Sequence, residues 1–218
     1  MRIFLYYGHE IPEFGGAGYD ASYPERTFAV QDLAGGLQGF TGRSARFDLM
    51  ILSTCFGGTP YTIGALRPFA RYIVASSDNL HLSYFDLHSL EQLDLGVRGG
   101  GVAAFAQRFA RRAFNRLTGN IPKAVSVAVY DVDRVQEFLH SVLSVYGHPT
   151  TTITTMENCD CADLPAYKLS TITEGVEVFF RPARFGRSKN KQRHSGWECW
   201  KERGLQAATS QTTEPALK

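Results

Sequence analysis

Two side chains near the start of the chain have the chemistry of nucleophilic catalysis. Cys55 follows a short apolar run and precedes Phe56-Gly57-Gly58, and His9 follows a second apolar run that ends at Gly8. A thiolate is a strong nucleophile, and a histidine within hydrogen-bond reach raises the thiolate fraction and can protonate a leaving amine. A glycine-rich turn after the nucleophile can present backbone N–H groups to a developing oxyanion. These residue types therefore fit acyl transfer by a cysteine–histidine pair.

Taken alone, both residues also fit plainer roles. A cysteine at a strand end is commonly a small buried apolar residue, and a lone histidine beside a glycine-rich loop commonly has no chemical task. A thiol oxidoreductase is disfavoured because the chain has no C-x-x-C motif. The catalytic reading therefore requires a fold that brings the two side chains together.

The elements that would position them follow from the apolar pattern. Apolar runs and alternation predict strands over 3–7, 49–52, 72–75, 124–130 and 171–180. Periodicity and capping signals predict helices over 27–37, over 61–70 with a break at Pro68, over 102–117 with Gly119 at the C-cap, and from Asp133 onward. Glycine and proline predict a loop over 10–24.

Strands that alternate with helices predict an α/β sandwich with a mostly parallel central sheet. Ligands of such sheets collect at the carboxyl ends of the strands. His9 and Cys55 directly follow the strands predicted over 3–7 and 49–52. We therefore expect the two side chains to approach each other across this edge of the sheet.

Composition narrows the class of protein. The chain has 218 residues, of which 44% are apolar and 20% charged, which predicts one α/β domain over 1–187 and a basic, then polar tail over 188–218. The longest apolar stretch is far shorter than the roughly 20 residues that cross a bilayer, and no signal-peptide core follows Met1. We expect no membrane contact, and a cytoplasmic location for the chain as written; if the natural N-terminus lies further upstream, the location stays open.

Charge and cysteine spacing suggest no further ligand. The net charge is only +2, although residues 98–123 contain six bases and no acid. These bases fall on one side of a predicted helix without an aromatic–basic motif, which is typical of a solvated face, so no nucleic-acid partner is expected. Cys159, Cys161, His194 and Cys199 could together supply the four ligands of a zinc site. Its C-x-C spacing is shorter than structural zinc sites use, and no metal is expected there.

The segment FDLMILSTCFGG at 47–58, followed by LRPFARYIVAS at 66–76, resembles the nucleophile segment of the clostripain family of caspase-like cysteine peptidases. In the family, the nucleophile segment consists of an apolar strand, Asp-x-Cys followed by small residues, a helix, and a strand that ends in Ala-Ser. The strand ending in Tyr7-Gly8-His9 is similar to the family's histidine strand, and 124–131 resembles a further family segment. The resemblance covers about residues 2–180.

The resemblance implies a caspase-like three-layer sandwich and an endopeptidase that cleaves peptide bonds with Cys55 as nucleophile and His9 as general acid and base. It implies oxyanion donors in the backbone amides of Glu10 and Cys55, and a peptide or protein substrate. The substrate pocket would be formed by Ser53, Ser76 and Asp78. No cofactor is expected, apart from the calcium that some relatives use, and the oligomeric state stays open.

The chain departs from the family pattern at three places. Glu10 replaces the glycine after the histidine, and Ser53 replaces the acid that helps to select Arg or Lys; Asp78 is the candidate substitute. The chain also begins only a few residues before the histidine strand, so the domain is expected to lack N-terminal elements. Two functions therefore stay open: an endopeptidase with relaxed basic-residue preference, and an inactive caspase-like binding or regulatory domain.

Overall fold

The computed structural model describes residues 1–12, 22–41, 45–76, 80, 85, 90, 101–122, 125–135, 175–181 and 184. They form a five-stranded sheet in which the strands stand in chain order: β1 (Ile3–Tyr7), β2 (Phe47–Ser53), β3 (Ala70–Ala75), β4 (Val125–Asp131) and β5 (Val176–Arg181). β1, β2 and β3 pair in parallel, and β4 is antiparallel to both of its neighbours. Since β5 therefore runs in the direction of β1 to β3, only β4 is reversed, and the expected mostly parallel sheet is confirmed.

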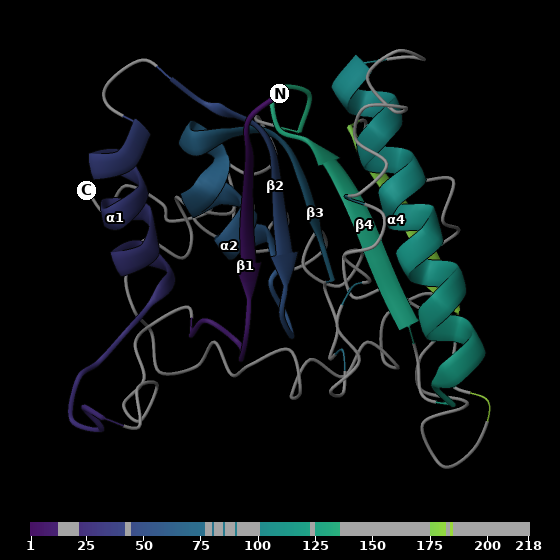
Figure 1. Ribbon diagram of the computed structural model, residues 1–218, viewed down its shortest axis with the longest axis horizontal. Coiled ribbons are helices and arrows are strands. Elements are labelled where there is room, and N and C mark those ends of the chain that lie inside the picture. Colours follow the sequence, from purple (N-terminus) through teal and green to yellow (C-terminus); the bar gives the residue numbers. More distant parts are fainter. Residues whose placement is uncertain are drawn as a thin grey trace, which may run out of the picture.

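Helices cover both faces of the sheet (Figure 1). One layer contains α1 (Val30–Thr41) and α2 (Pro60–Leu66), which leads into the 3₁₀ turn η1 (Arg67–Phe69). The other layer contains α4 (Gly101–Asn120), which packs mainly on β4. The three-layer α/β sandwich is therefore confirmed, and so is the break that Pro68 predicted.

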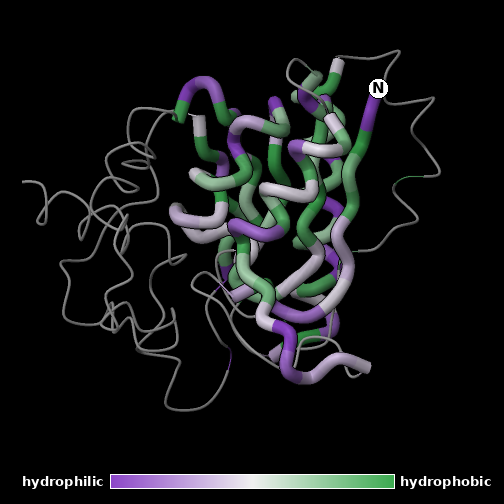
Figure 2. Tube along the Cα trace, turned by 90° about the vertical axis from the view of Figure 1, so that its left-hand side faces the viewer, coloured by the Kyte–Doolittle hydropathy of each residue, from purple (hydrophilic) through white to green (hydrophobic). Residues whose placement is uncertain are grey.

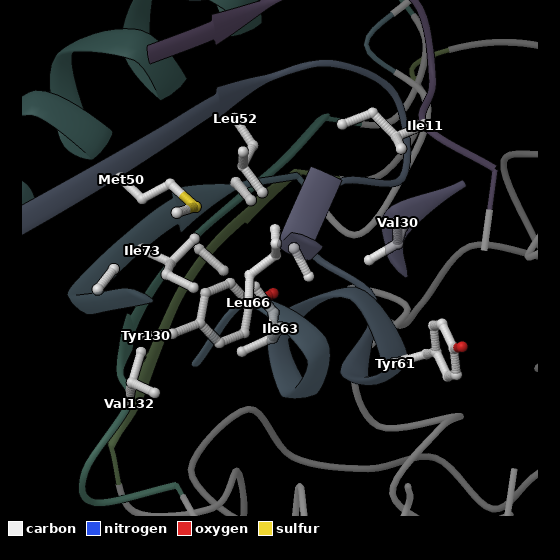
Figure 3. Close-up of a cluster of buried hydrophobic side chains, with 14 of the residues drawn as sticks. Ile11, Val30, Met50, Leu52, Tyr61, Ile63, Leu66, Ile73, Tyr130 and Val132 are labelled. Atoms are coloured by element: carbon white, nitrogen blue, oxygen red, sulfur yellow. The ribbon is translucent and has the colours of Figure 1, made fainter. Parts of the chain in front are cut away.

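The central strand β2 is buried on both faces. Leu49 and Ile51 point into the cluster beneath α4, whereas Met50 and Leu52 point into the cluster beneath α1 and α2, and all four side chains are 0% exposed. Figure 3 shows the second cluster, where Met50 and Leu52 lie with side chains of α2 and β4. The strands are mostly green in Figure 2, as expected for a sheet that is covered on both sides.

The bounds of α1 and α4 differ from those predicted. α1 begins three residues later, where the backbone N–H of Ala29 donates to Asp32 Oδ2 at 2.8 Å, and it continues past Gly35 and Gly36 because Leu37 is buried. The prediction of Gly119 as the C-cap of α4 is wrong. The helix continues to Asn120, and the N–H of the buried Ile121 donates to Leu117 O at 2.9 Å. Packing of Ile121 thus extends the last turn beyond the glycine.

Several predictions fall outside the described residues. They are the loop between residues 13 and 21, the helix beyond residue 135, the tail over 188–218, and the residues considered for zinc: Cys159, Cys161, His194 and Cys199. In the part of the chain that the structure describes, no helix is long and apolar enough to cross a membrane.

Candidate active site

The register of β1 and β2 places His9 and Cys55 at the same edge of the sheet. Tyr7 pairs with Ser53, and the N–H of Gly8 donates to Ser53 O at 3.4 Å. His9 and Cys55 each follow this pair by two positions. Because neighbouring strands are about 4.8 Å apart, both side chains leave the carboxyl edge from adjacent backbones. In Figure 1 this is the edge to which the arrowheads of β1 and β2 point.

The segment that carries His9 is held on both sides. Before it, the Tyr6 hydroxyl donates to His9 O at 3.1 Å. After it, the side chain of Ile11 is 5% exposed and belongs to the cluster beneath α1, while Pro12 O accepts from the N–H of Val30 at 2.9 Å. His9 is exposed and Glu10 half-buried. The imidazole is therefore presented to solvent from an anchored backbone.

The turn that carries Cys55 has an unusual conformation. Phe56 has φ = 53°, in the left-handed region that costs a non-glycine residue about 1–3 kcal/mol. A Cβ atom on Gly57 would lie 2.8 Å from Thr54 Cγ2, so only glycine fits there. The chain then enters α2, where Thr59 caps the helix by accepting from the N–H of Thr62 and Pro60 takes the first helical position. Backbone strain directly after the candidate nucleophile indicates that this turn has a functional role in addition to reversing the chain direction.

Two hydrogen bonds from other strands hold this turn. The N–H of Gly58 donates to Ser76 O, at the end of β3, at 2.7 Å. The hydroxyl of Tyr130, which is 0% exposed on β4, donates to Gly58 O at 2.6 Å. Figure 3 shows Tyr130 reaching from β4 toward α2, across the face that α2 covers. The position of Cys55 is therefore fixed by three strands rather than by β2 alone.

The structure also places the other predicted site residues. Cys55 is partly exposed and packs against the cluster beneath α4. Ser53 is 0% exposed and its hydroxyl accepts from the N–H of Phe85 at 2.9 Å, whereas Ser76 is 1% exposed. Asp78 lies outside the described residues. The described candidates therefore gather at one edge, where His9, Glu10 and Cys55 are more accessible than Ser53 and Ser76.

Tyr130 was not singled out by the sequence analysis. A tyrosine at the end of the run 124–130, which is apolar except for Ser126, was a usable signal, because a buried phenol normally requires a hydrogen-bond partner. That requirement predicts that the Tyr130 hydroxyl forms a hydrogen bond but does not identify the acceptor, because the acceptor depends on the position of β4 beside β3.

A separate polar cavity lies at the opposite edge. It has a volume of about 520 Å³, and its lining includes Arg2, Arg46, Asp48, Tyr72, Asp131 and Asp133. Burial and the neighbouring Asp131 raise the pKa of Tyr72 above its ordinary value. Arg46 is committed to the fold, since it pairs with Asp133 at 2.8 Å and donates to Ala70 O. Among the described residues, no cluster of three or more His, Cys, Asp or Glu side chains could hold a metal ion.

No protein-family profile and no curated protein sequence matches this chain. Solved structures do. A secreted C11 cysteine protease from Bacteroides thetaiotaomicron, bound to an irreversible peptide inhibitor, is 13% identical, and the match covers 66% of this chain and 43% of that protein with a TM-score of 0.51. An inactive zymogen C11 protease from Parabacteroides distasonis is 16% identical, with coverages of 75% and 41% and a TM-score of 0.45.

A clostripain from Bacteroides thetaiotaomicron, bound to a peptide inhibitor, is 13% identical, with coverages of 61% and 54% and a TM-score of 0.40. This chain thus spans less than half the length of the first protein, at 43%. Identities this low bear on the fold alone, and the fold agrees with the resemblance found in the sequence. The chain has the caspase-like α/β fold of the clostripain-family C11 cysteine proteases.

Proposed function

We propose that this chain is a cysteine endopeptidase domain in which Cys55 is the nucleophile and His9 the general acid and base. The observation that carries the proposal is the presence of a partly exposed thiol and an exposed imidazole after neighbouring parallel strands, in the fold of cysteine proteases. Each residue alone has plainer explanations. Their shared edge and the strained, anchored turn at Phe56 favour the catalytic one.

The chemistry requires two stages. His9 takes the proton of the Cys55 thiol, and the sulfur attacks the carbonyl carbon of the substrate. The C–N bond then breaks, the leaving amine receives the proton from His9, and an acyl thioester remains. In the second stage His9 takes a proton from water, the hydroxide attacks the thioester, and the carboxylic acid leaves while the thiol is restored.

The oxyanion formed in both stages needs backbone donors. Within the turn, the amides of Gly58 and Thr59 donate to Ser76 O and Phe56 O. The proposed donors therefore remain the amides of Glu10 and Cys55, on either side of the gap between the two strands. The Glu10 side chain adds a negative charge near a developing anion, which opposes catalysis unless solvent or a cation screens it.

The primary specificity pocket is proposed to be less selective than one that contains an acid. Ser53 offers only a neutral hydroxyl, and in this conformation it accepts from Phe85 N. A charge-assisted hydrogen bond to Arg or Lys would thus depend on another group, and Asp78 is the candidate.

The alternative is an inactive domain that binds a partner through the same edge. Glu10 and the buried, already bonded Ser53 favour it, because both stand where the family pattern has a residue suited to catalysis or specificity. An irreversible electrophile separates the two functions, since it needs a reactive thiolate and a pocket rather than a bound partner.

The test is labelling of the full chain with a panel of peptidyl electrophiles, followed by mass-spectrometric identification of the modified cysteine. We expect modification at Cys55 and loss of both labelling and peptide cleavage in Cys55→Ala. A variant in which Cys159, Cys161 and Cys199 are replaced by alanine is the matched control and should retain both. Cleavage that persists in Cys55→Ala would show that another residue is the nucleophile. Absence of labelling and cleavage in the parent protein would favour the inactive domain.

A further inference from the structure

The outward face of α4 carries charge of one sign. Arg108, Arg111, Arg112 and Arg116 are all exposed, while the opposite side of the helix is buried on the sheet. Every exposed position of α4 holds arginine, asparagine, glutamine or glycine, and the helix contains no acidic residue. We call these four residues the α4 arginine stripe.

The stripe is poorly explained by stability of the helix. Arg108 lies three and four residues before Arg111 and Arg112, and Arg112 lies four residues before Arg116. Like charges at these spacings face each other on a helix, and no acidic residue within α4 offsets them. Solubility does not require arginines without acids between them, because a surface that mixes acidic and basic side chains is equally soluble. The pattern therefore favours a role in recognition.

The neighbouring strand shows how this surface accommodates a carboxylate. Arg111 lies 3.9 Å from Glu177 on β5, and its guanidinium is 5.0 Å from the centre of the Phe179 ring, yet its side chain remains 65% exposed. A guanidinium offers a planar fork of donors that matches a carboxylate. Positive charge continues at the end of the helix, where Arg184 donates to Thr118 O at 3.0 Å. There, burial and Arg184 lower the pKa of Arg181.

The stripe points toward the candidate active site. β4 begins at the edge where β1 and β2 end, because Ala128 pairs with Ala75 and Asp131 with Tyr72. α4 ends at Asn120, shortly before β4 begins, so its carboxyl end lies at the edge that carries Cys55 (Figure 1). A polypeptide held on the stripe could therefore continue to that edge.

We propose that the α4 arginine stripe binds an acidic stretch of the protein substrate; the identification of the partner as a substrate rests on the proposed function. From Arg108 to Arg116 the stripe spans about 12 Å at 1.5 Å per residue, which matches roughly four extended residues. A single-stranded nucleic acid would need aromatic side chains on which its bases could stack, and membrane insertion would need apolar ones. The exposed positions of α4 provide neither.

The test measures binding in Cys55→Ala, so that it needs no cleavage. A fluorescent oligo-glutamate peptide is titrated by anisotropy, with oligo-glutamine as the neutral control. Arg112→Gln/Arg116→Gln removes two stripe charges and preserves helix propensity. Arg26→Gln/Arg71→Gln is the matched control, because it removes two exposed charges elsewhere. We expect the first variant to bind the peptide about fivefold more weakly or worse, and the control to bind like the parent.

Several results would overturn the proposal: no binding of oligo-glutamate, equal weakening in both variants, or tighter stripe-dependent binding of an oligonucleotide or of phosphatidylserine vesicles with the same probe charge. Failure of the proposed function looks different. In that case the parent protein does not cleave peptides, while stripe-dependent binding of oligo-glutamate in Cys55→Ala persists.

Discussion

Replacing Tyr130 by phenylalanine removes one oxygen atom, and with it a tether between β4 and the turn of Cys55. The phenol is fully buried and donates to Gly58 O at 2.6 Å. Phenylalanine preserves the ring and therefore the packing beneath α2. The substitution thus isolates the hydrogen bond from the apolar contacts of the same side chain.

The expected loss of stability follows from the buried carbonyl that remains. Gly58 is itself buried, so Gly58 O cannot turn to solvent when the hydroxyl is removed. A buried acceptor that loses its partner costs about 1–3 kcal/mol. Of the two bonds from other strands described above, the one from Gly58 N to Ser76 O would then remain. A shift of about 1 Å at a reacting group can lower a rate by about a hundredfold, so the reactivity of Cys55 should fall as well.

Two measurements check this: the free energy of unfolding in urea, and the rate at which a peptidyl electrophile modifies Cys55. Tyr61→Phe is the matched control. Tyr61 belongs to the same cluster, but its hydroxyl accepts from Nε2 of Gln31, on α1, at 3.2 Å. We expect its removal to cost less than about 1 kcal/mol and to leave Cys55 labelling unchanged. Equal stability and equal labelling rates in both variants would refute the idea that the hydrogen bond from Tyr130 to Gly58 O holds the Cys55 turn.

Three further predictions concern other parts of the molecule. Gly57→Ala should destabilise the fold by about 1–3 kcal/mol, because its Cβ would meet Thr54 Cγ2 at 2.8 Å, whereas Gly39→Ala, with open space around it on α1, should stabilise it by about 0.5–1 kcal/mol; urea midpoints compare the two. Because the pKa of Tyr72 is raised in the folded protein, the unfolded chain loses this phenolic proton at a lower pH than the folded protein does. The contribution of Tyr72 to the free energy of unfolding, measured as the difference between wild type and Tyr72→Phe, should therefore be complete below pH 10.0 and decline above it. Urea unfolding of both proteins across this pH range checks the prediction. A substrate panel varied at the residue before the cut should show a weak preference for Arg over neutral residues, or a strong one that Asp78→Asn abolishes; a strong preference that survives in Asp78→Asn would contradict the relaxed pocket.

The sequence predicted the strands of this fold well because their signals are local. β1 coincides with the apolar run 3–7. β2 begins two residues before its predicted run and ends one residue after it, and β3 begins two residues before its run and ends with it. Helix ends were predicted less well. Gly35, Gly36 and Gly119 are unfavourable in helices, but burial of Leu37 and Ile121 outweighs that preference. A contact of this kind depends on elements distant in the sequence.

The site divides in the same way. That Cys55 and His9 follow neighbouring strands could be inferred from two apolar runs and the rule for parallel sheets. That Ser53 would be occupied by the N–H of Phe85, or that Tyr130 would reach Gly58, could not. These bonds join residues 32 and 72 positions apart, and only the packed sheet brings them together.

The burial of β2 on both faces has a consequence for how the candidate nucleophile moves. Amide protons in a strand covered by two independent apolar layers exchange with solvent only when most of the domain opens. The Cys55 turn is attached directly to that strand and tied to β3 and β4. Local fluctuations that expose loops will therefore hardly move the Cys55 thiol. Reagents then react with this thiol while the protein is in its native state. The rate of its modification then measures the chemistry of the surface around it, and stays constant with added urea until the whole sheet unfolds.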